Sequence, residues 1–432
     1  MKKILLIVID GLGDEPIPQL KNKTPLEKAE TPNLDFLAKK GILGLVLPYF
    51  EKGKLPTSED THLALFGFDP KISNPGRGVL EVLGIGMEIL PGDVCLRGNF
   101  GTLDEKMKIL DRRAGRLENT EPLIEAISNI EIEGVKFLIK KAFSHRIGIV
   151  MRGLQPIHHP PALGGPLNLS SEISDGDPKK INVKPKKIKA LKISAKFTAK
   201  LLNEFLKRAH QILKNHPLNK KRKLPANYIL VRGAGKLKKF LDFSKKYKLK
   251  SCCIAGGTLY KGIGKYLGMD LIQAEGADGL QNTNLKGKIL AAEKALKKYN
   301  FIFCHIKAAD NLAEDGNFLG KEEFIEKIDR NLKPLVKLKD VLFVVTGDHS
   351  TCSILKSHCK RPNPILIFPP KPRFQFESGA RRASGFKKFT RLSFTEQKLG
   401  GFSEKECQKG KFGKIKQINL MKKILELKNL YE

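Results

Sequence analysis

Carboxylates and imidazoles that suit a divalent metal ion follow three apolar runs of the sequence, at residues 2–9, 301–305 and 341–346. The groups are Asp10, Asp310, Asp348, His349 and His358. Mixed oxygen and nitrogen ligands favour Mn²⁺, Zn²⁺ or Co²⁺ over Ca²⁺. A single Asp after a strand is commonly a helix cap, which is the better explanation for Asp10 alone. The prediction of a metal site therefore depends on the whole set.

A serine lies at a predicted helix start. Thr57 and Asp60 have the spacing of a capping box ahead of the apolar residues 63–66. Ser58 would then occupy the first turn, where free backbone N–H groups favour an alkoxide or a phosphate and a metal activates the hydroxyl further. Taken alone, this segment is better explained as a plain helix N-terminus.

Arginines in the middle of the chain suit anion binding. Residues 111–116 (DRRAGR) and the pair His145 and Arg146 combine several guanidinium groups with few acids. Arginine binds phosphate or carboxylate in a bidentate manner, whereas lysine acts as a point charge. Ordinary surface charge explains these residues equally well until the rest of the chain is considered.

A parallel sheet is the element expected to position the metal-binding groups. Short, continuous, β-branched apolar runs occur at residues 2–9, 228–232, 301–305, 341–346 and 364–368. Such runs are typical of buried parallel strands, and helical patterns at 286–298 and 322–335 lie between them. The pattern predicts an α/β fold with a mostly parallel sheet and helices on both faces. Functional groups in such folds collect at the carboxyl ends of the strands.

Residues 98–190 have a different character, with shorter runs and stretches rich in Pro and Gly at 154–166 and 174–185. We predict that they form a smaller inserted α+β domain. Residues 1–97 and 191–432 would then form one core domain.

The composition is compatible with two ordinary domains, since the chain has 432 residues and is 41% hydrophobic. Its 79 Lys and Arg against 45 Asp and Glu give a formal charge of +34, which favours anionic partners. Nucleic acid is the competing class of partner. Trp is absent, aromatic residues are 7%, and zinc-finger or RNP-like motifs are missing, so we expect no nucleic-acid partner.

No apolar run approaches the ~20 residues that cross a bilayer, so we expect a soluble, cytoplasmic protein with no membrane partner. The chain has 7 Cys without a C-x-x-C pair, which predicts no disulfide framework. Cys304 and Cys352 are expected to be small buried hydrophobes. Oligomeric state does not follow from the sequence.

In their order along the chain, these motifs resemble those of the archaeal-type 2,3-bisphosphoglycerate-independent phosphoglycerate mutases, which belong to the alkaline phosphatase superfamily. The resemblance covers nearly the whole chain. It rests on residues 9–14 (IDGLGD), 23–27 (KTPLE), 31–34 (TPNL), 62–67 (HLALFG), 75–78 (PGRG), 91–93 (PGD), 111–116 (DRRAGR), 232–235 (RGAG), 260–262 (YKG), 305–308 (HIKA) and 346–351 (TGDHST). It implies an alkaline-phosphatase-like core with an inserted lid domain that binds the substrate.

The resemblance implies interconversion of 2- and 3-phosphoglycerate in glycolysis and gluconeogenesis, through a phosphoserine, with two divalent ions and no bisphosphoglycerate. Ser58 matches the nucleophile. Asp10, Ser58, Asp348 and His349 match the ligands of one ion, and Asp310 and His358 match two ligands of the other. Lys307, Asp111 and Asp175 match segments that would stabilise charge or exchange protons, and Arg112, His145, Arg146 and Arg232 match substrate-binding segments.

Two positions depart from the family pattern. Glu314 stands where the family usually has a metal-binding His, one helical turn after Asp310 and on the same face. An extra carboxylate favours Mn²⁺, our first expectation, or Mg²⁺ over Zn²⁺, with Co²⁺ also possible. A degraded second metal site is the alternative. Lys179 replaces a family His after Ser174 and Asp175.

A related metal-dependent phosphatase or a phosphomutase acting on another phosphorylated acid is the competing function. The arginines favour a mutase, because a hydrolase need not retain its dephosphorylated intermediate. The basic segment 373–388 receives no functional explanation from the sequence.

Overall fold

The computed structural model describes residues 3–153, 169–338, 340–368 and 400–430. The chain divides into two compact units. Unit 1 comprises Met1–Ile72, Phe243–Gly257 and Gly268–Glu432, and unit 2 comprises Ser73–Asp242 and Thr258–Leu267. The whole Pro- and Gly-rich stretch 154–166 and the whole basic segment 373–388 lie outside the described residues.

Unit 1 is built on an eight-stranded sheet with the order β10-β9-β11-β1-β12-β15-β2-β16. Its strands are β1 (Lys3–Ile9), β2 (Ile42–Leu47), β9 (Ser251–Ile254), β10 (Asp270–Leu271), β11 (Phe301–Ile306), β12 (Val341–Thr346), β15 (Asn363–Phe368) and β16 (Gly413–Lys416). β15 runs antiparallel to both neighbours, and the other strand pairs are parallel. The mostly parallel sheet is confirmed, although the run at 364–368 forms its antiparallel member.

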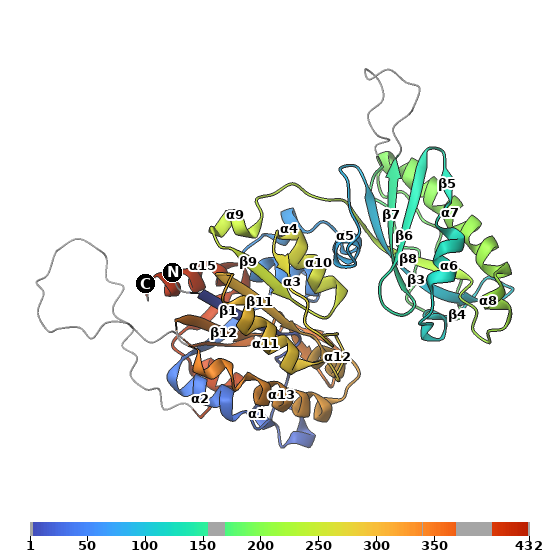
Figure 1. The fold of residues 1–432 in the computed structure, drawn as a ribbon. Helices are drawn as coiled ribbons and strands as arrows, with labels where there is room; N and C mark the ends of the chain where they lie inside the picture. The colour runs from blue at the N-terminus through green and yellow to red at the C-terminus, as the bar shows by residue number, and fades with distance from the viewer. Residues whose placement is uncertain (1–2, 154–168, 339, 369–399, 431–432) are drawn as a thin grey trace, which may run out of the picture. The chain divides into compact units, whose positions relative to one another are not determined.

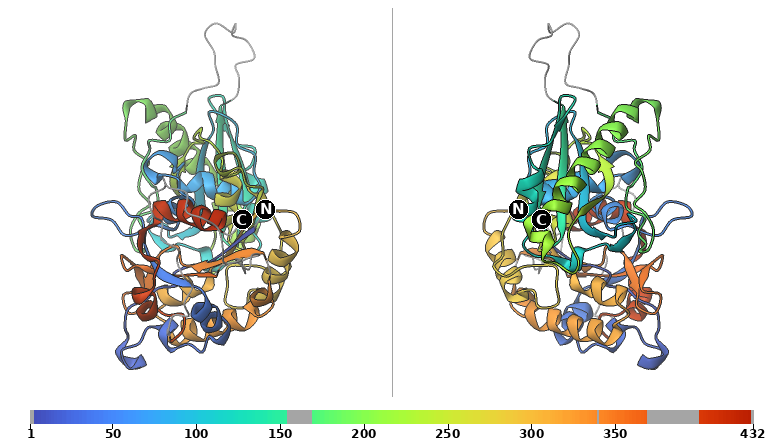
Figure 2. Two further views of the ribbon diagram at one scale, coloured as in Figure 1. Left: turned by 90° about the vertical axis from the view of Figure 1, so that its left-hand side faces the viewer. Right: turned by 90° about the vertical axis from the view of Figure 1, so that its right-hand side faces the viewer.

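Helices cover both faces of this sheet, as predicted (Figures 1 and 2). They are α1 (Pro25–Lys28), α2 (Pro32–Lys40), α3 (Ser58–Leu65), α9 (Phe243–Tyr247), α11 (Leu285–Ala295), α12 (Ala308–Glu314), α13 (Phe318–Leu332), α14 (Glu404–Lys409) and α15 (Leu420–Leu430). Alternate residues of a strand point to opposite faces. Leu5 and Ile7 join the apolar cluster of α2, α11 and α13. On the opposite face, the Phe303 ring contacts Phe66 at the end of α3, with centroids 4.9 Å apart.

Unit 2 contains an antiparallel sheet with the order β4-β3-β7-β6-β5, in which β8 pairs with β3. Its elements are α5 (Arg77–Gly84), β3 (Val94–Leu103), β4 (Ile109–Asp111), α6 (Glu121–Ile127), β5 (Glu131–Ile132), β6 (Val135–Lys141), β7 (Arg146–Gly153), α7 (Lys196–Asn215), α8 (Pro217–Lys220), β8 (Tyr228–Gly235) and α10 (Thr258–Tyr266). α7 lies across one face (Figure 2), where Phe205 stacks on Phe137 with centroids 4.2 Å apart. α5 packs against the other face, where Val82 and Ile85 leave no room for a side chain at Gly148. α4 (Pro70–Ser73) spans the change of unit along the sequence.

The units differ from the predicted domain boundaries. The predicted start at residue 98 falls inside β3, and unit 2 continues beyond residue 190 to Asp242. The run at 228–232, which we assigned to the parallel sheet, pairs antiparallel with β3 instead. A short apolar run shows that a strand is buried but not which sheet it joins. Among the described helices, none has both the length and the apolar character that a membrane span requires.

The predicted start of α3 at Ser58 is confirmed. Thr57 Oγ1 accepts a hydrogen bond from the Asp60 backbone N–H at 3.3 Å. The Thr57 hydroxyl is also 2.9 Å from Oδ2 of Asp60, to which it donates. A helix cap of this kind holds the first turn, and with it Ser58, in place.

We expect Thr57→Ala to lower the free energy of unfolding by about 1 kcal/mol, because the first turn loses its side-chain cap. Urea denaturation followed by circular dichroism measures the change. Thr57→Ser, which keeps the hydroxyl, is the matched control. Equal midpoints for the Ala and Ser variants would show that the cap contributes nothing.

Candidate active site

The carboxyl ends of three parallel strands bring the predicted carboxylates together. Asp10 follows β1, Asp310 lies in the first turn of α12 after β11, and Asp348 follows β12, and all three side chains are buried. Gly11 has φ +65°, and a Cβ there would lie 2.8 Å from Cβ of Asp310. Glycine therefore lets the loop after β1 approach α12 closely.

His349 lies between two of these carboxylates. Its Nε2 is 3.4 Å from Oδ1 of Asp10 and 3.2 Å from Oδ2 of Asp348. The same nitrogen is 3.4 Å from Oγ of Ser58, which is itself buried at the start of α3. Asp10, Asp348 and His349 each offer a ligand atom within 4.8 Å of the others. The residues predicted for the first ion are thus gathered around one point.

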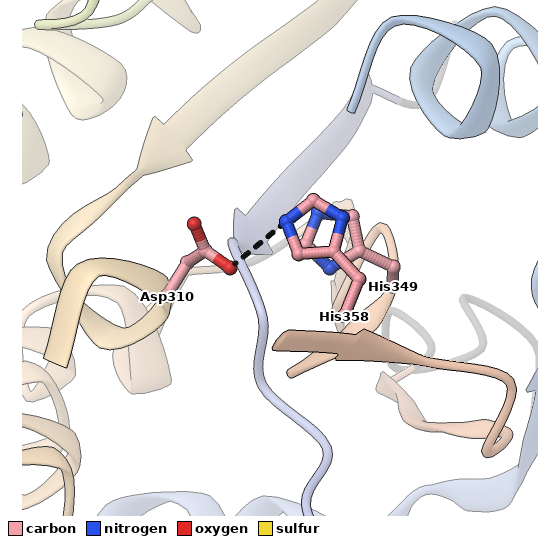
Figure 3. Close-up of side chains that lie close together, drawn as sticks. All are labelled: Asp310, His349 and His358. Carbon is pink, nitrogen blue, oxygen red and sulfur yellow. Dashed lines mark ion pairs between the residues drawn. The ribbon is translucent and has the colours of Figure 1, made fainter. Parts of the chain in front are cut away.

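A second group consists of Asp310, His349 and His358 (Figure 3). Nε2 of His358 is 3.5 Å from Oδ1 of Asp310 and 3.6 Å from Oε1 of Glu314. The two imidazole rings stack with centroids 3.8 Å apart. His349 therefore belongs to both candidate groups, whereas we predicted it only for the first. Glu314, whose side chain is 50% exposed, lies on the solvent side of His358.

The two imidazoles are carried by a short hairpin of β13 (Ser350–Cys352) and β14 (Ser357–Cys359). Cys352 and Cys359 form a disulfide within it. The prediction that Cys352 is simply a small buried hydrophobe was wrong, because antiparallel pairing brings the two cysteines together. Cys304 is buried and free, as predicted.

Buried negative charge dominates the electrostatics of the site. Burial opposes ionisation of Asp10, but Lys307 and two imidazoles hold the pKa of this carboxyl well below its ordinary value. Burial also opposes ionisation of Asp310, but Lys307, His349 and His358 together lower the pKa of this carboxyl. Burial and the neighbouring Asp10 raise the pKa of Asp348 to about 7. Lys307 contacts both Asp10 and Asp310 as an ion pair.

The imidazole of His349 is neutral at neutral pH. Burial and the adjacent His358 lower the pKa of His349 to about 4, so one ring nitrogen keeps its lone pair at neutral pH. Partial burial and Asp310 raise the pKa of Glu314. A cation in the site would reverse that shift, since it favours the ionised carboxyl.

The donor set fits divalent ions. Both carboxylate oxygens of Asp10 are buried without a hydrogen bond among the described residues, although charged or ring nitrogens approach them. A buried carboxylate in this state requires a cation or further donors. Carboxylates with neutral imidazoles suit Mn²⁺, Zn²⁺ or Co²⁺.

Unit 2 holds an arginine cluster, which we define as Arg77, Arg97, Arg112, Arg146 and Arg232. Arg97, Arg146 and Arg232 come from β3, β7 and β8, and Arg77 comes from α5. Glu81 Oε1 lies 3.4 Å from both Arg97 and Arg77. Burial, assisted by neighbouring arginines, lowers the pKa of Arg97 to about 9. Arg112 binds Asp177 through two hydrogen bonds of 3.0 and 2.6 Å. Glu81 and Asp177 form ion pairs with members of this cluster, and five guanidinium groups close together give it a positive charge that suits an anion.

Other predicted substrate residues in unit 2 have local partners. One oxygen of Asp111 accepts backbone hydrogen bonds from Arg113 and Gly115. The exposed Asp175 accepts one from the backbone N–H of Gly233 at 2.8 Å. His145 is buried, and burial together with Arg146 lowers its pKa to about 4.

Several residues of these clusters were not predicted. Arg77, Glu81 and Arg97 lie in the cluster of unit 2, and His62 and His305 lie beside the carboxylates of unit 1. Arg77, His62 and His305 stand within the motifs quoted above, so a signal was present without an assigned role. Glu81 and Arg97 are each a single charged residue within an apolar run, so the sequence alone does not indicate a functional role for them. Their ion pair forms only because α5 packs against β3.

Comparisons with known proteins agree with this geometry. Residues 2–427 match the model of the metalloenzyme superfamily. The 2,3-bisphosphoglycerate-independent phosphoglycerate mutase 1 of Archaeoglobus fulgidus is 39% identical over 440 residues, which cover 99% of this chain and 98% of that protein. Its counterpart in Methanocaldococcus jannaschii is 40% identical over 436 residues, which cover 98% and 97%. The chain belongs to the 2,3-bisphosphoglycerate-independent phosphoglycerate mutase family.

Two solved structures share the fold. The cofactor-independent phosphoglycerate mutase of Thermoplasma acidophilum aligns with a TM-score of 0.65 and 31% identity, covering 99% of this chain and 100% of that one. A Pyrococcus horikoshii protein aligns with a TM-score of 0.77 and 30% identity, covering 100% and 98%. The family resemblance found in the motifs is confirmed.

We expect the affinity for Mn²⁺ to fall as the pH falls below about 7, because Asp348, with its pKa raised to about 7, must then lose a proton to bind the ion. One displaced proton gives about a tenfold loss per pH unit. Calorimetric titration in buffers of different ionisation heat counts the protons released. Asp348→Asn should flatten the pH dependence, and equal wild-type affinities at pH 6 and 8 would contradict the assignment.

Proposed function

We propose that this chain interconverts 2-phosphoglycerate and 3-phosphoglycerate without added bisphosphoglycerate, through a phosphoserine at Ser58 and with two divalent ions. The observation that carries the proposal is the position of Ser58 Oγ, 3.4 Å from His349 and beside the buried Asp10 and Asp348. Hydroxyl, carboxylates and neutral imidazole at one point are what phosphoryl transfer through a serine requires.

Ser58 is the proposed nucleophile. Its hydroxyl gives up its proton as Oγ attacks the phosphorus of the substrate in line, the ester bond to the glycerate oxygen breaks, and that oxygen takes up a proton. The free hydroxyl on the neighbouring carbon then loses its proton and attacks the phosphoserine, the Oγ–phosphorus bond breaks, and Oγ of Ser58 takes up a proton. The start of α3 supports the charge on Oγ through free backbone N–H groups.

Asp10, Ser58, Asp348 and His349 would hold one ion, and Asp310, Glu314 and His358 the other. When bound, the ions would lower the pKa of the serine hydroxyl and neutralise the transferring phosphoryl group. Lys307, which forms ion pairs with Asp10 and Asp310, would pair with a phosphoryl oxygen of the substrate. Mn²⁺ is the ion that we propose first, because Glu314 adds a hard oxygen ligand.

The arginine cluster of unit 2 is the proposed binder of the glycerate carboxylate. Guanidinium groups hold carboxylates in bidentate pairs, and a glycerate held by its carboxylate stays bound while its hydroxyls exchange places. Asp111 or Asp175 would exchange protons with those hydroxyls. His145, kept neutral by burial and Arg146, would contribute a hydrogen bond. A role in glycolysis and a cytoplasmic location follow from this proposal and stay predictions.

A related phosphatase is the competing function. It would share the serine and the metal-binding residues but would need no group that retains the dephosphorylated acid. The excess of arginine over carboxylate in unit 2 therefore favours a mutase. Measuring phosphoglycerate interconversion against phosphate release separates the two activities.

We expect Ser58→Ala to lose essentially all mutase activity in the metal-loaded protein, because no phosphoserine can form. A coupled assay for 2-phosphoglycerate formation measures activity, and mass spectrometry of wild-type protein quenched with substrate locates the phosphate. Ser128→Ala, which removes a hydroxyl in unit 2 that bonds to the Ile124 carbonyl, is the control. Normal turnover by Ser58→Ala would refute the phosphoserine scheme.

We expect Glu314→Gln to weaken one of two bound Mn²⁺ ions, because the amide keeps the size of the side chain but loses its charge. Metal analysis after gel filtration and equilibrium titration measure the loss. Asp315→Asn changes the adjacent, exposed carboxylate and is the matched control. Two tightly bound equivalents in Glu314→Gln would remove this residue from the ligand set.

A further inference from the structure

Two buried histidines lie beside the metal-binding carboxylates. His62 belongs to α3, one helical turn after Ser58, and His305 belongs to β11. Both side chains are fully buried, and their ring centroids are 5.2 Å apart. Phe303 packs against both rings, with centroids 5.8 and 6.0 Å away. Packing against the ring of Phe303 thus restricts the orientation of each imidazole.

His62 contacts Asp348 and the start of α3 with one nitrogen. Its Nδ1 lies 2.8 Å from the backbone oxygen of Ser58 and 3.3 Å from Oδ2 of Asp348. A carbonyl oxygen only accepts hydrogen bonds, so Nδ1 must carry the hydrogen. The Thr61 hydroxyl donates to the same Oδ2 at 3.3 Å, and the Gly11 N–H donates to Oδ1 at 3.3 Å. These donors fix the plane of the Asp348 carboxylate.

His305 and His349 lie nearest to different oxygens of Asp10. Nε2 of His305 is 3.2 Å from Oδ2 of Asp10, whereas Nε2 of His349 is 3.4 Å from Oδ1. The low pKa of Asp10 keeps this carboxyl ionised, and an ionised carboxylate only accepts hydrogen bonds, so we infer that Nε2 of His305 carries the hydrogen. The backbone oxygen of His305 accepts a hydrogen bond from the buried Lys288 at 3.3 Å, which holds the end of β11.

We propose that His62 and His305 are positioning residues that orient Asp348 and Asp10 toward one ion, the one assigned to Asp10, Ser58, Asp348 and His349. This inference rests on the proposed two-ion site. Each histidine brings a ring nitrogen close to a carboxylate of that ion, 3.3 Å from Asp348 and 3.2 Å from Asp10, and neither carboxylate belongs to the Asp310, Glu314 and His358 set. Because His62 also binds the backbone of Ser58, it couples the orientation of Asp348 to the position of the nucleophile.

Removing such an outer partner lowers metal affinity by about 10- to 100-fold. We therefore expect His62→Leu and His305→Leu to lose about 10- to 100-fold in affinity for one of two Mn²⁺ ions and to keep the affinity for the other. His62→Asn and His305→Gln place an amide N–H close to the position of Nδ1 and Nε2, respectively, and should recover most of the loss. Calorimetric titration with Mn²⁺ alone measures both affinities, and thermal unfolding of the metal-free variants shows whether the fold is kept.

The outcomes test the two-ion site and the positioning role of the histidines separately. Fewer than two Mn²⁺ equivalents on the wild-type protein would overturn the proposed site. Two equivalents on the wild type, with unchanged affinities in all four variants or equal losses at both ions, would overturn the positioning role. Should the leucine variants fail to fold, ¹⁵N NMR of the metal-free wild-type imidazoles decides. Hydrogen on Nδ1 of His62 and Nε2 of His305 supports the proposal, and either opposite tautomer refutes it.

Discussion

The site depends on the concentration of buried negative charge at one edge of a parallel sheet. Strands that run in the same direction end at the same edge, so the residues that follow β1, β11 and β12 must lie close together. Here those residues are Asp10, Asp310 and Asp348, all buried. Removing a carboxylate from water costs several kcal/mol unless positive charge or donors replace the solvent. Lys307, the imidazoles and the proposed cations supply that compensation. The proposed phosphoryl transfer uses the same positive groups to stabilise the charge of the phosphoryl group.

A second buried ion pair, between Lys321 and Asp14, stabilises the loops at this edge of the sheet. Lys321 of α13 is fully buried and donates to Asp14 at 2.9 Å and to the backbone oxygens of Gly13 and Thr351 at 3.1 and 3.0 Å. Asp14 in turn accepts from the N–H and hydroxyl of Ser353. The loop after β1 and the hairpin of β13 and β14 are thus tied to one ammonium group. Loss of either charge would leave the other buried and unpaired, which is more costly than the pair itself.

Sequence reasoning found the groups whose position follows from simple periodicity. Asp10, Asp310 and Asp348 stand at the ends of apolar runs, and Glu314 lies one helical turn from Asp310. Ser58 was placed correctly because a cap has a fixed spacing to its helix. His358 was identified as a candidate ligand from its place after the same strand as Asp348, and the resemblance assigned it to the second ion. Its approach to Asp310 depends on the hairpin of β13 and β14, which the periodicity of the sequence does not predict.

The parts of the fold and of the candidate site that the sequence did not predict depend on contacts between segments far apart in the sequence. The run at 228–232 has the same apolar character in either sheet, so only its pairing with β3 reveals that it belongs to unit 2. His62 and His305 fit the apolar patterns of a helix and a strand, and their polar role appears only where α3 and β11 meet Asp348 and Asp10. The composition of β15 likewise does not predict that this strand runs antiparallel to its neighbours.

The bond between Cys352 and Cys359 has a consequence for the denatured chain. It closes a small ring with His358 inside and His349 a few residues outside, so both imidazoles stay near each other after the tertiary structure is lost. The unfolded chain therefore has fewer conformations to lose in this loop when it folds, so the disulfide lowers the entropic cost of ordering the hairpin that holds His358.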